Sequence, residues 1–225
     1  NVRILQRATA AVAAPGRGHQ PPPPPLVPAR HGRVRVSIAV SSYKKIWQKT
    51  GEVFEEVPLE LPPHEYDTRA CWIDLPMHAP LAAEATTGGD GYAGLHGAAH
   101  ALLAVLPLHV SCGAQDVGCE CSALRERRLR SRRLLLYDKC RGGLGIARRA
   151  AAELPAMLRS ARELVADCAC AADGDDGCPM CVHIVGCTEY NAVTSRRGAL
   201  AVLDGLIEGV ATEAEAPLVE TGEAP

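Results

Sequence analysis

Five cysteines gather in one short segment of this sequence. Cys168 and Cys170 form a C-x-C pair, and Cys178 and Cys181 form a C-x-x-C pair after a loop of seven residues. Zinc prefers four ligands in a tetrahedron, and thiolates are its common ligands in structural sites. The two pairs therefore predict a four-cysteine zinc site, for which Cys187 is an alternate ligand.

Four thiolates close the coordination shell, so we predict a structural rather than a catalytic zinc. A catalytic zinc keeps an open position, usually with histidine or carboxylate ligands and a water. The predicted metal would link the end of one helix to the start of the next across a polar loop. Binding of this kind contributes on the order of 10 kcal/mol to folding. His183 is a sixth candidate, but we expect it at the surface or behind the ligands.

Two other uses of the cysteines stay open. Ten cysteines in a secreted protein would indicate disulfides, but the close spacing of five of them favours a shared metal. A redox C-x-x-C pair is the second alternative. The additional C-x-C pair argues against it.

Positive charge is concentrated in one stretch, although the formal net charge of the chain is only -2. Such a run could neutralise several phosphates of a nucleic acid, and a solvated surface is the alternative. A second candidate is Lys44 and Lys45, beside Tyr43 and Trp47, where a base could stack. The arginines of the first candidate are Arg125, Arg127, Arg128, Arg130, Arg132 and Arg133.

Three further groups have both a chemical and a structural interpretation. His96 and His100 have an i, i+4 spacing that can bind metal, but no water-activating carboxylate accompanies them, so we expect packing or capping. Asp138 follows a strand and is expected to cap a turn. The glycines of residues 142–145 are expected to allow close packing of a strand and a helix rather than to hold a phosphate.

The elements that position these residues predict an α+β fold: a small antiparallel β region, then a mixed α/β domain with a helix-flanked four-cysteine zinc site. Alternating apolar residues predict a meander of strands over 33–40, 53–61 and 68–75, with further strands over 108–112 and 134–137. Helices are expected over 92–106, 144–167 with a kink or break at Pro155, and 193–210 with Thr194 or Ser195 as N-cap.

Composition divides the chain into four parts. Residues 1–32 contain five consecutive prolines and predict a disordered linker; residues 33–79 are β-rich; residues 92–210 form the zinc-binding domain; residues 211–225 predict an acidic disordered tail. The sequence begins with Asn1, so we expect a piece of a longer protein. It carries no apolar run long enough to span a bilayer and no evident signal peptide, which favours an intracellular location.

The order of motifs resembles the C-terminal domain of MrfA-type helicases and their eukaryotic RecQ-like relatives, which are superfamily 2 DNA helicases. The resemblance covers roughly residues 33–207. Its most specific parts are the strand ending in Tyr137-Asp138, the glycine turn over 142–145 and the cysteine cluster with Cys178-Pro179-Met180-Cys181. The chain departs from the family at Arg141, where proline is common, and in its longer basic and acidic loops.

The resemblance implies an accessory domain of an ATP-dependent 3′–5′ DNA helicase associated with DNA repair. It implies a structural Zn²⁺, guidance of single-stranded DNA, and a nuclear location. The sequence has no G-x-x-x-x-G-K-[ST] loop, so ATP and Mg²⁺ would be bound only by motor domains upstream in a parent chain.

Two alternative functions stay open. The chain could be a stand-alone zinc-binding scaffold for protein interactions, or a metal- or cysteine-dependent hydrolase that uses Asp138, His100 or Cys140. DNA binding that weakens steeply with salt would favour the helicase accessory domain, a stable protein complex would favour the scaffold, and turnover without ATP would favour the hydrolase.

Overall fold

The computed structural model describes residues 2–8, 29–75, 90–121, 133–172 and 174–212. The predicted proline-rich segment falls largely outside these residues, as do the basic stretch from 122 to 132 and the tail from 213 onward. Within the described residues the chain has an α+β fold, as the sequence predicts.

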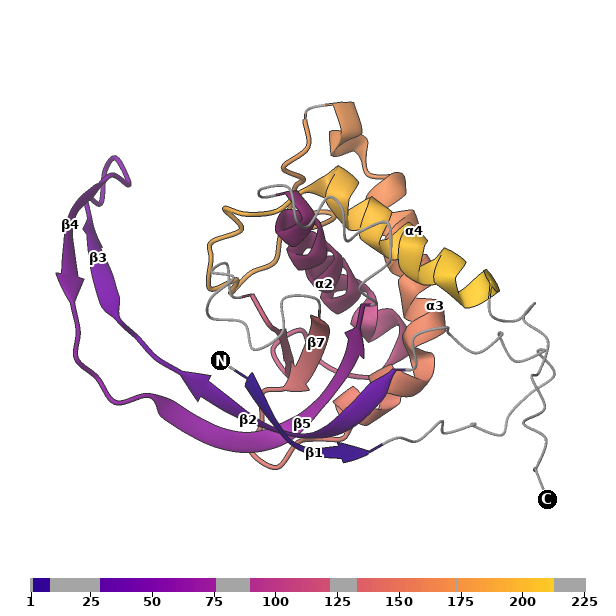
Figure 1. Ribbon diagram of the computed structural model, residues 1–225. Coiled ribbons are helices and arrows are strands. Elements are labelled where there is room, and N and C mark those ends of the chain that lie inside the picture. Colours follow the sequence, from indigo (N-terminus) through magenta and orange to yellow (C-terminus); the bar gives the residue numbers. More distant parts are fainter. Residues whose placement is uncertain (1, 9–28, 76–89, 122–132, 173, 213–225) are drawn as a thin grey trace, which may run out of the picture.

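The centre of the fold is an antiparallel sheet with the strand order β1-β2-β5-β7-β6 (Figure 1). Every pair of neighbours in it is antiparallel. The predicted strands over 33–40, 68–75 and 134–137 correspond to β2, β5 and β7. Its strands are β1 (Val2–Ala8), β2 (Arg30–Ile38), β5 (His64–Asp74), β7 (Arg133–Asp138) and β6 (Val117–Cys119).

Between β2 and β5 the chain leaves this sheet and forms a separate hairpin of β3 (Ser42–Ile46) and β4 (Val53–Pro58). The hairpin projects away from the helices (Figure 1). It is closed at Gly51, which has a φ of 74°, and by a hydrogen bond from the backbone N–H of Trp47 to the carbonyl of Glu52. The predicted meander is therefore wrong, because β2 pairs directly with β5 over nine residue pairs.

The linker predicted over 1–32 is also wrong at both of its ends. Residues 2–8 form β1, which pairs with β2 from Val2 opposite Val36 to Ala8 opposite His31. Residues 30–32 belong to β2 itself. The proline run dominated the composition of this segment and hid the short strand beside it, whose unpaired backbone finds partners on the edge of β2.

Three α-helices group together beside the sheet (Figure 1). They are α2 (Asp90–His109), α3 (Ile146–Ala166) and α4 (Arg196–Thr212), and a short 3₁₀ helix, η2 (Ala169–Ala172), follows α3. Each α-helix packs against the other two. In the part of the chain that is described, no helix has the length and apolar character needed to cross a membrane.

Two prolines, Pro107 and Pro155, lie inside helices, and neither ends its helix. Helix α2 continues through Pro107 to His109, so the strand predicted over 108–112 is wrong, and α3 runs unbroken through Pro155. A proline costs its helix one hydrogen bond and some steric strain. In both helices a buried apolar face offsets that cost, including Leu102 and Leu106 in α2 and Met157 in α3.

Successive side chains of a strand point to opposite faces of its sheet, so β5 and β7 contribute to two different hydrophobic clusters. Cys71 and Ile73 of β5 join the large core under the helices, whereas Ala70 and Trp72 join Val34, Val36 and Leu135 in a smaller cluster on the other face. Because β5 and β7 pair with each other, the predicted β-rich segment and zinc-binding segment share one sheet.

The carboxylate of Asp138 joins the sheet to α3. It is fully buried at the end of β7, where one oxygen accepts the backbone N–H groups of Leu144 (2.7 Å) and Gly145 (2.9 Å) and the other accepts that of Ala147 (2.8 Å). The turn comes close enough that a Cβ added at Gly143 would lie 2.5 Å from Cγ of Arg69. The predicted capping role of Asp138 and the packing role of the glycine turn are confirmed.

At the other end of the helical group, Ser195 caps α4 as predicted. Its hydroxyl oxygen accepts the backbone N–H of Gly198 at 2.9 Å, the interaction expected between an N-cap residue and the third residue of a helix. The same hydroxyl donates to Asp175 at 2.7 Å, and Asp175 also accepts the backbone N–H of Arg197. The start of α4 is thereby tied to the loop that carries the cysteines.

We expect Asp138→Ala to lower the free energy of unfolding of the zinc-loaded chain by about 3 kcal/mol or more, because three buried N–H groups lose their acceptor. Urea unfolding followed by circular dichroism measures the change. Asp116→Ala is the matched control, since Asp116 accepts a single N–H, that of Gly113, in a surface turn and should cost about 1 kcal/mol or less. Equal losses in the two variants would contradict the structural role assigned to Asp138.

Candidate metal centres

The first candidate centre lies where α3 ends. Cys168 and Cys170 follow the last residue of α3 and lie in and beside η2, while Cys178 and Cys181 flank a tight turn that is closed by a hydrogen bond from the N–H of Cys181 to the carbonyl of Cys178. The structure brings all four predicted sulfurs together, within 4.8 Å of one another. None of the ten cysteines forms a disulfide.

The distances between these sulfurs fit a tetrahedral zinc. They are 3.5 Å for Cys168 and Cys178, 3.4 Å for Cys168 and Cys170, 3.6 Å for Cys170 and Cys181, and 3.8 Å for Cys178 and Cys181. Zinc–sulfur bonds of 2.3 Å give a tetrahedron whose edges are about 3.8 Å. The donor set is therefore chemically and geometrically suited to Zn²⁺, with no position left for water.

Backbone N–H groups stabilise the thiolates of this group. The N–H of Cys170 donates to the Cys168 sulfur and, with the neighbouring sulfurs, lowers the pKa of that thiol to about 7. Burial raises the pKa of the Cys181 thiol instead. Two further backbone N–H groups donate to sulfur: that of Cys178 to the sulfur of Cys181, and that of Met180 to the sulfur of Cys178, both at 3.4 Å. Near neutral pH a metal would therefore have to displace protons from part of this group.

His183 lies outside the four-cysteine group, as predicted, and is hydrogen-bonded within the loop. Its Nε2 atom lies 3.0 Å from the carbonyl oxygen of Asp176 and 3.1 Å from Oγ1 of Thr194. It therefore links the loop after α3 to the residues that precede α4. The structure also places Cys187 outside the group, which removes it as an alternate ligand there.

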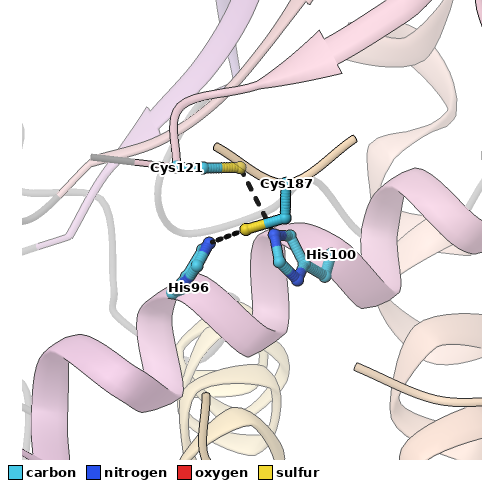
Figure 2. Close-up of side chains that lie close together, drawn as sticks. All are labelled: His96, His100, Cys121 and Cys187. Carbon is cyan, nitrogen blue, oxygen red and sulfur yellow. Dashed lines mark hydrogen bonds between the residues drawn. The ribbon is translucent and has the colours of Figure 1, made fainter. Parts of the chain in front are cut away.

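The sulfur of Cys187 instead belongs to a second group with His96, His100 and Cys121 (Figure 2). The two histidines project from one face of α2, and the two cysteines approach them from other parts of the chain. All four residues are buried, and their ligand atoms lie within 4.8 Å of one another. From the sequence we expected packing or capping for the two histidines, although their i, i+4 spacing can bind metal, and no spacing rule connected them to Cys121 and Cys187.

The residues predicted to bind nucleic acid divide into three cases. Arg125 to Arg132 lie outside the described residues. Arg133 is a correction: it is only 6% exposed, its guanidinium lies 2.6 Å from Asp74 and it stacks over Trp72, so it supports the sheet instead of facing solvent. Lys44 and Lys45 lie on β3. Nζ of Lys45 forms an ion pair with Oε2 of Glu55 at 2.7 Å, and Nζ of Lys44 lies 5.8 Å from the ring centroid of Tyr190.

Two of the three residues of the hydrolase alternative, Asp138 and His100, are already engaged in hydrogen bonds. Both carboxylate oxygens of Asp138 accept backbone N–H groups, and His100 is fully buried with one ring nitrogen on the carbonyl of Val182 and the other on Cys121. Cys140 is exposed. Neither Asp138 nor His100 is therefore placed to act as a base for it.

Comparison with known proteins finds a family model that matches the part of the chain containing the first centre. Residues 98–182 match the family model described as the MrfA Zn-binding domain. This range contains Cys168, Cys170, Cys178 and Cys181. It ends before Cys187 and begins after His96.

Two curated proteins similar to this chain carry the name of helicases. The ATP-dependent helicase HRQ1 of Saccharomyces cerevisiae is 27% identical over 208 residues, which cover 88% of this chain and 19% of that protein. The ATP-dependent helicase hrq1 of Schizosaccharomyces pombe is 29% identical over 188 residues, covering 78% of this chain and 17% of that protein. The chain therefore spans less than a fifth of the length of either relative.

A solved structure supports the fold. The crystal structure of the DUF1998 helicase MrfA bound to DNA superposes with a TM-score of 0.59 and 22% identity, covering 91% of this chain and 24% of that one. At this identity the likeness shows that the two chains share a fold.

Zinc affinity of the four-cysteine group is expected to fall as the pH is lowered from 8 to 6, because protons compete with zinc for the thiolates and the pKa of Cys168 is about 7. Competition with a chromophoric chelator at pH 6, 7 and 8 measures this, using the Cys187→Ser variant so that only the first group is complete. We expect a loss of at least about tenfold across this range. An affinity independent of pH would argue against thiolate ligation.

Proposed function

We propose that the chain, whose residues 98–182 match the MrfA Zn-binding domain family, is the zinc-bearing accessory region of an ATP-dependent DNA helicase. The observation that carries this proposal is the four-cysteine group, whose sulfurs converge within the matched residues at spacings suited to zinc. Cys168, Cys170, Cys178 and Cys181 are the proposed ligands. The similarity to two helicases over most of this chain supports the same role.

The zinc supplies a cross-link and no reaction chemistry. Two of its ligands follow the end of α3 and two flank a turn in the segment between α3 and α4, so the metal would fix the position of that segment against the end of α3. The protein's own residues complete the junction: Asp175 binds the start of α4, and Arg196 donates to the carbonyl of Ala166 at the end of α3 at 3.1 Å. The domain thereby offers a rigid surface beside a motor.

We propose that this surface guides single-stranded DNA. The arginines at 125, 127, 128, 130 and 132 supply charge for phosphates, and the β3–β4 hairpin supplies Lys44 and Lys45 with exposed aromatic rings nearby. Trp47 and Phe54 lie 4.6 Å apart on that hairpin and are about half exposed, which suits stacking with bases.

ATP and Mg²⁺ would be bound by helicase motor domains acting with this chain, because the chain contains no phosphate-binding loop of its own. A helicase of this kind would unwind DNA in the 3′–5′ direction during DNA repair. In a eukaryotic cell its place would be the nucleus.

A stand-alone scaffold for protein interactions is the second candidate function. The observation that favours it is the same hairpin, which exposes Tyr43, Ile46, Trp47, Val53 and Phe54. Exposed apolar residues gathered on one projecting element are typical of protein interaction sites. A partner protein that covers this hairpin would occupy the surface proposed here for DNA.

DNA binding and its salt dependence separate the two functions. We expect the zinc-loaded chain to bind a fluorescent single strand, with an affinity that falls steeply between 50 and 200 mM salt. Neutralising Arg127, Arg128, Arg130 and Arg132 to glutamine should reduce the slope of log K against log salt by about 3, since each phosphate contact to a single strand contributes about 0.7. Fluorescence anisotropy measures both.

Arg148→Gln with Arg159→Gln is the control, because both arginines lie exposed on α3 and are not part of the proposed DNA-binding set. This pair of changes should leave the slope nearly unchanged. A chain that holds zinc but binds no DNA, and forms a stable complex with a protein through the hairpin, would overturn the DNA role and favour the scaffold.

A further inference from the structure

We propose a second zinc site, formed by His96, His100, Cys121 and Cys187. It is separate from the four-cysteine group and does not depend on the proposed helicase role. The family match includes His100 and Cys121 but neither His96 nor Cys187, so a complete set of these ligands lies beyond the matched domain. Figure 2 shows the four side chains converging above one face of α2.

The orientation of both histidines is fixed in the way that metal binding requires. Nδ1 of His96 lies 2.7 Å from the carbonyl oxygen of Val193, and Nδ1 of His100 lies 2.7 Å from that of Val182. A carbonyl oxygen can only accept a hydrogen bond, so each Nδ1 carries the proton. In a neutral imidazole the Nε2 lone pair is then free to bind a metal, and a hydrogen bond of this kind commonly orients zinc-bound histidines.

Both lone pairs are directed at sulfur. Nε2 of His100 lies 3.3 Å from the sulfur of Cys121, and Nε2 of His96 lies 3.5 Å from that of Cys187. Zinc bonds of about 2.0 Å to nitrogen and 2.3 Å to sulfur place such atoms about 3.5 Å apart in a tetrahedron. The rings themselves meet edge to face with centroids 4.1 Å apart, so that all four donors surround one point.

A network of hydrogen bonds without metal is the competing explanation. Each thiol could donate its proton to the nearest Nε2 atom, which would satisfy the two nitrogens as two separate pairs. Thiols are weak donors, however, and two pairs do not require that all four atoms gather within 4.8 Å. Zinc replaces both thiol protons, which are released to water, and uses the four atoms as one set.

The site would add an anchor to a segment that is otherwise held by hydrogen bonds, including two between the side chain of Asn191 and the backbone of Ile184. Residues 183–195 contain no helix or strand, and Tyr190 and Asn191 have positive φ values of 53° and 58°. Cys187 attaches this segment to α2, and Cys121 attaches the chain that follows β6 to the same point. Complete burial of both histidines and a closed set of four ligands assign the site a structural role.

The two zinc sites would be mechanically linked. Val182, whose carbonyl orients His100, directly follows Cys181 of the first group, and Cys187 lies only a few residues further on. One short segment thus contributes to both sites. Loss of the first zinc should therefore weaken binding at the second.

The wild-type chain, purified with zinc under reducing conditions, tests the proposal without any variant. We expect two zinc ions per chain by mass spectrometry of the metal content. X-ray absorption at the zinc edge should show, on average, three sulfur ligands and one nitrogen ligand per zinc. One zinc per chain with four sulfur ligands would overturn the second site and leave the proposed function standing, and a chain that binds no zinc would overturn both.

Single substitutions locate the ligands. Cys187→Ser and Cys121→Ser should each lower the content from two zinc ions to one and leave a spectrum with sulfur ligands only. Cys119→Ser is the matched control, because its buried sulfur lies 3.3 Å from that of Cys121 but outside the group. Two zinc ions in this control support the proposal, whereas loss of one zinc from the control but not from Cys121→Ser would overturn the assigned ligand set.

Discussion

The loop between α3 and α4 has no strand or α-helix among its described residues, and the arrangement of the helices depends on how its side chains are cross-linked. It places Cys181, Val182 and Cys187 in the core, whereas Met180 and Val185 are exposed and the acidic part that includes Asp175 and Asp176 is polar. Sulfur, imidazole and carboxylate groups therefore add to hydrophobic packing in fixing its path. A metal bound by thiolates can provide a large fraction of the stability of such a segment, because its ligands are assembled only in the folded chain.

A second constraint connects this cysteine-bearing loop to the sheet. The buried carboxylate of Asp138 accepts N–H groups from the turn before α3 and from Ala147 in its first turn, so β7 holds the start of the helix, and the cysteines lie at its end. The side chains of His96 and His100 on α2 face Cys187, which belongs to the same loop between α3 and α4. The sheet, the helices and the candidate metal centres thus form one connected structure, from which the β3–β4 hairpin projects as a separate arm.

Sequence reasoning succeeded where the information was local. The four cysteines of the first group lie within fourteen residues, and the cap at Ser195 and the turn after Asp138 are short-range features. It failed where distant segments decide the result. The pairing of β2 with β5, the strand β1 and the buried ion pair of Arg133 all depend on partners far along the chain. Cys187 lies 91 residues from His96, and no spacing rule joins them.

The central claim is that zinc is bound by the sulfurs of Cys168, Cys170, Cys178 and Cys181. A crystal of the reduced chain, measured on both sides of the zinc absorption edge, tests it most directly. The account predicts an anomalous difference peak at the centre of these four sulfur atoms, about 2.3 Å from each. Sulfurs joined in disulfides, or a chain that is ordered there without any anomalous peak, would contradict it.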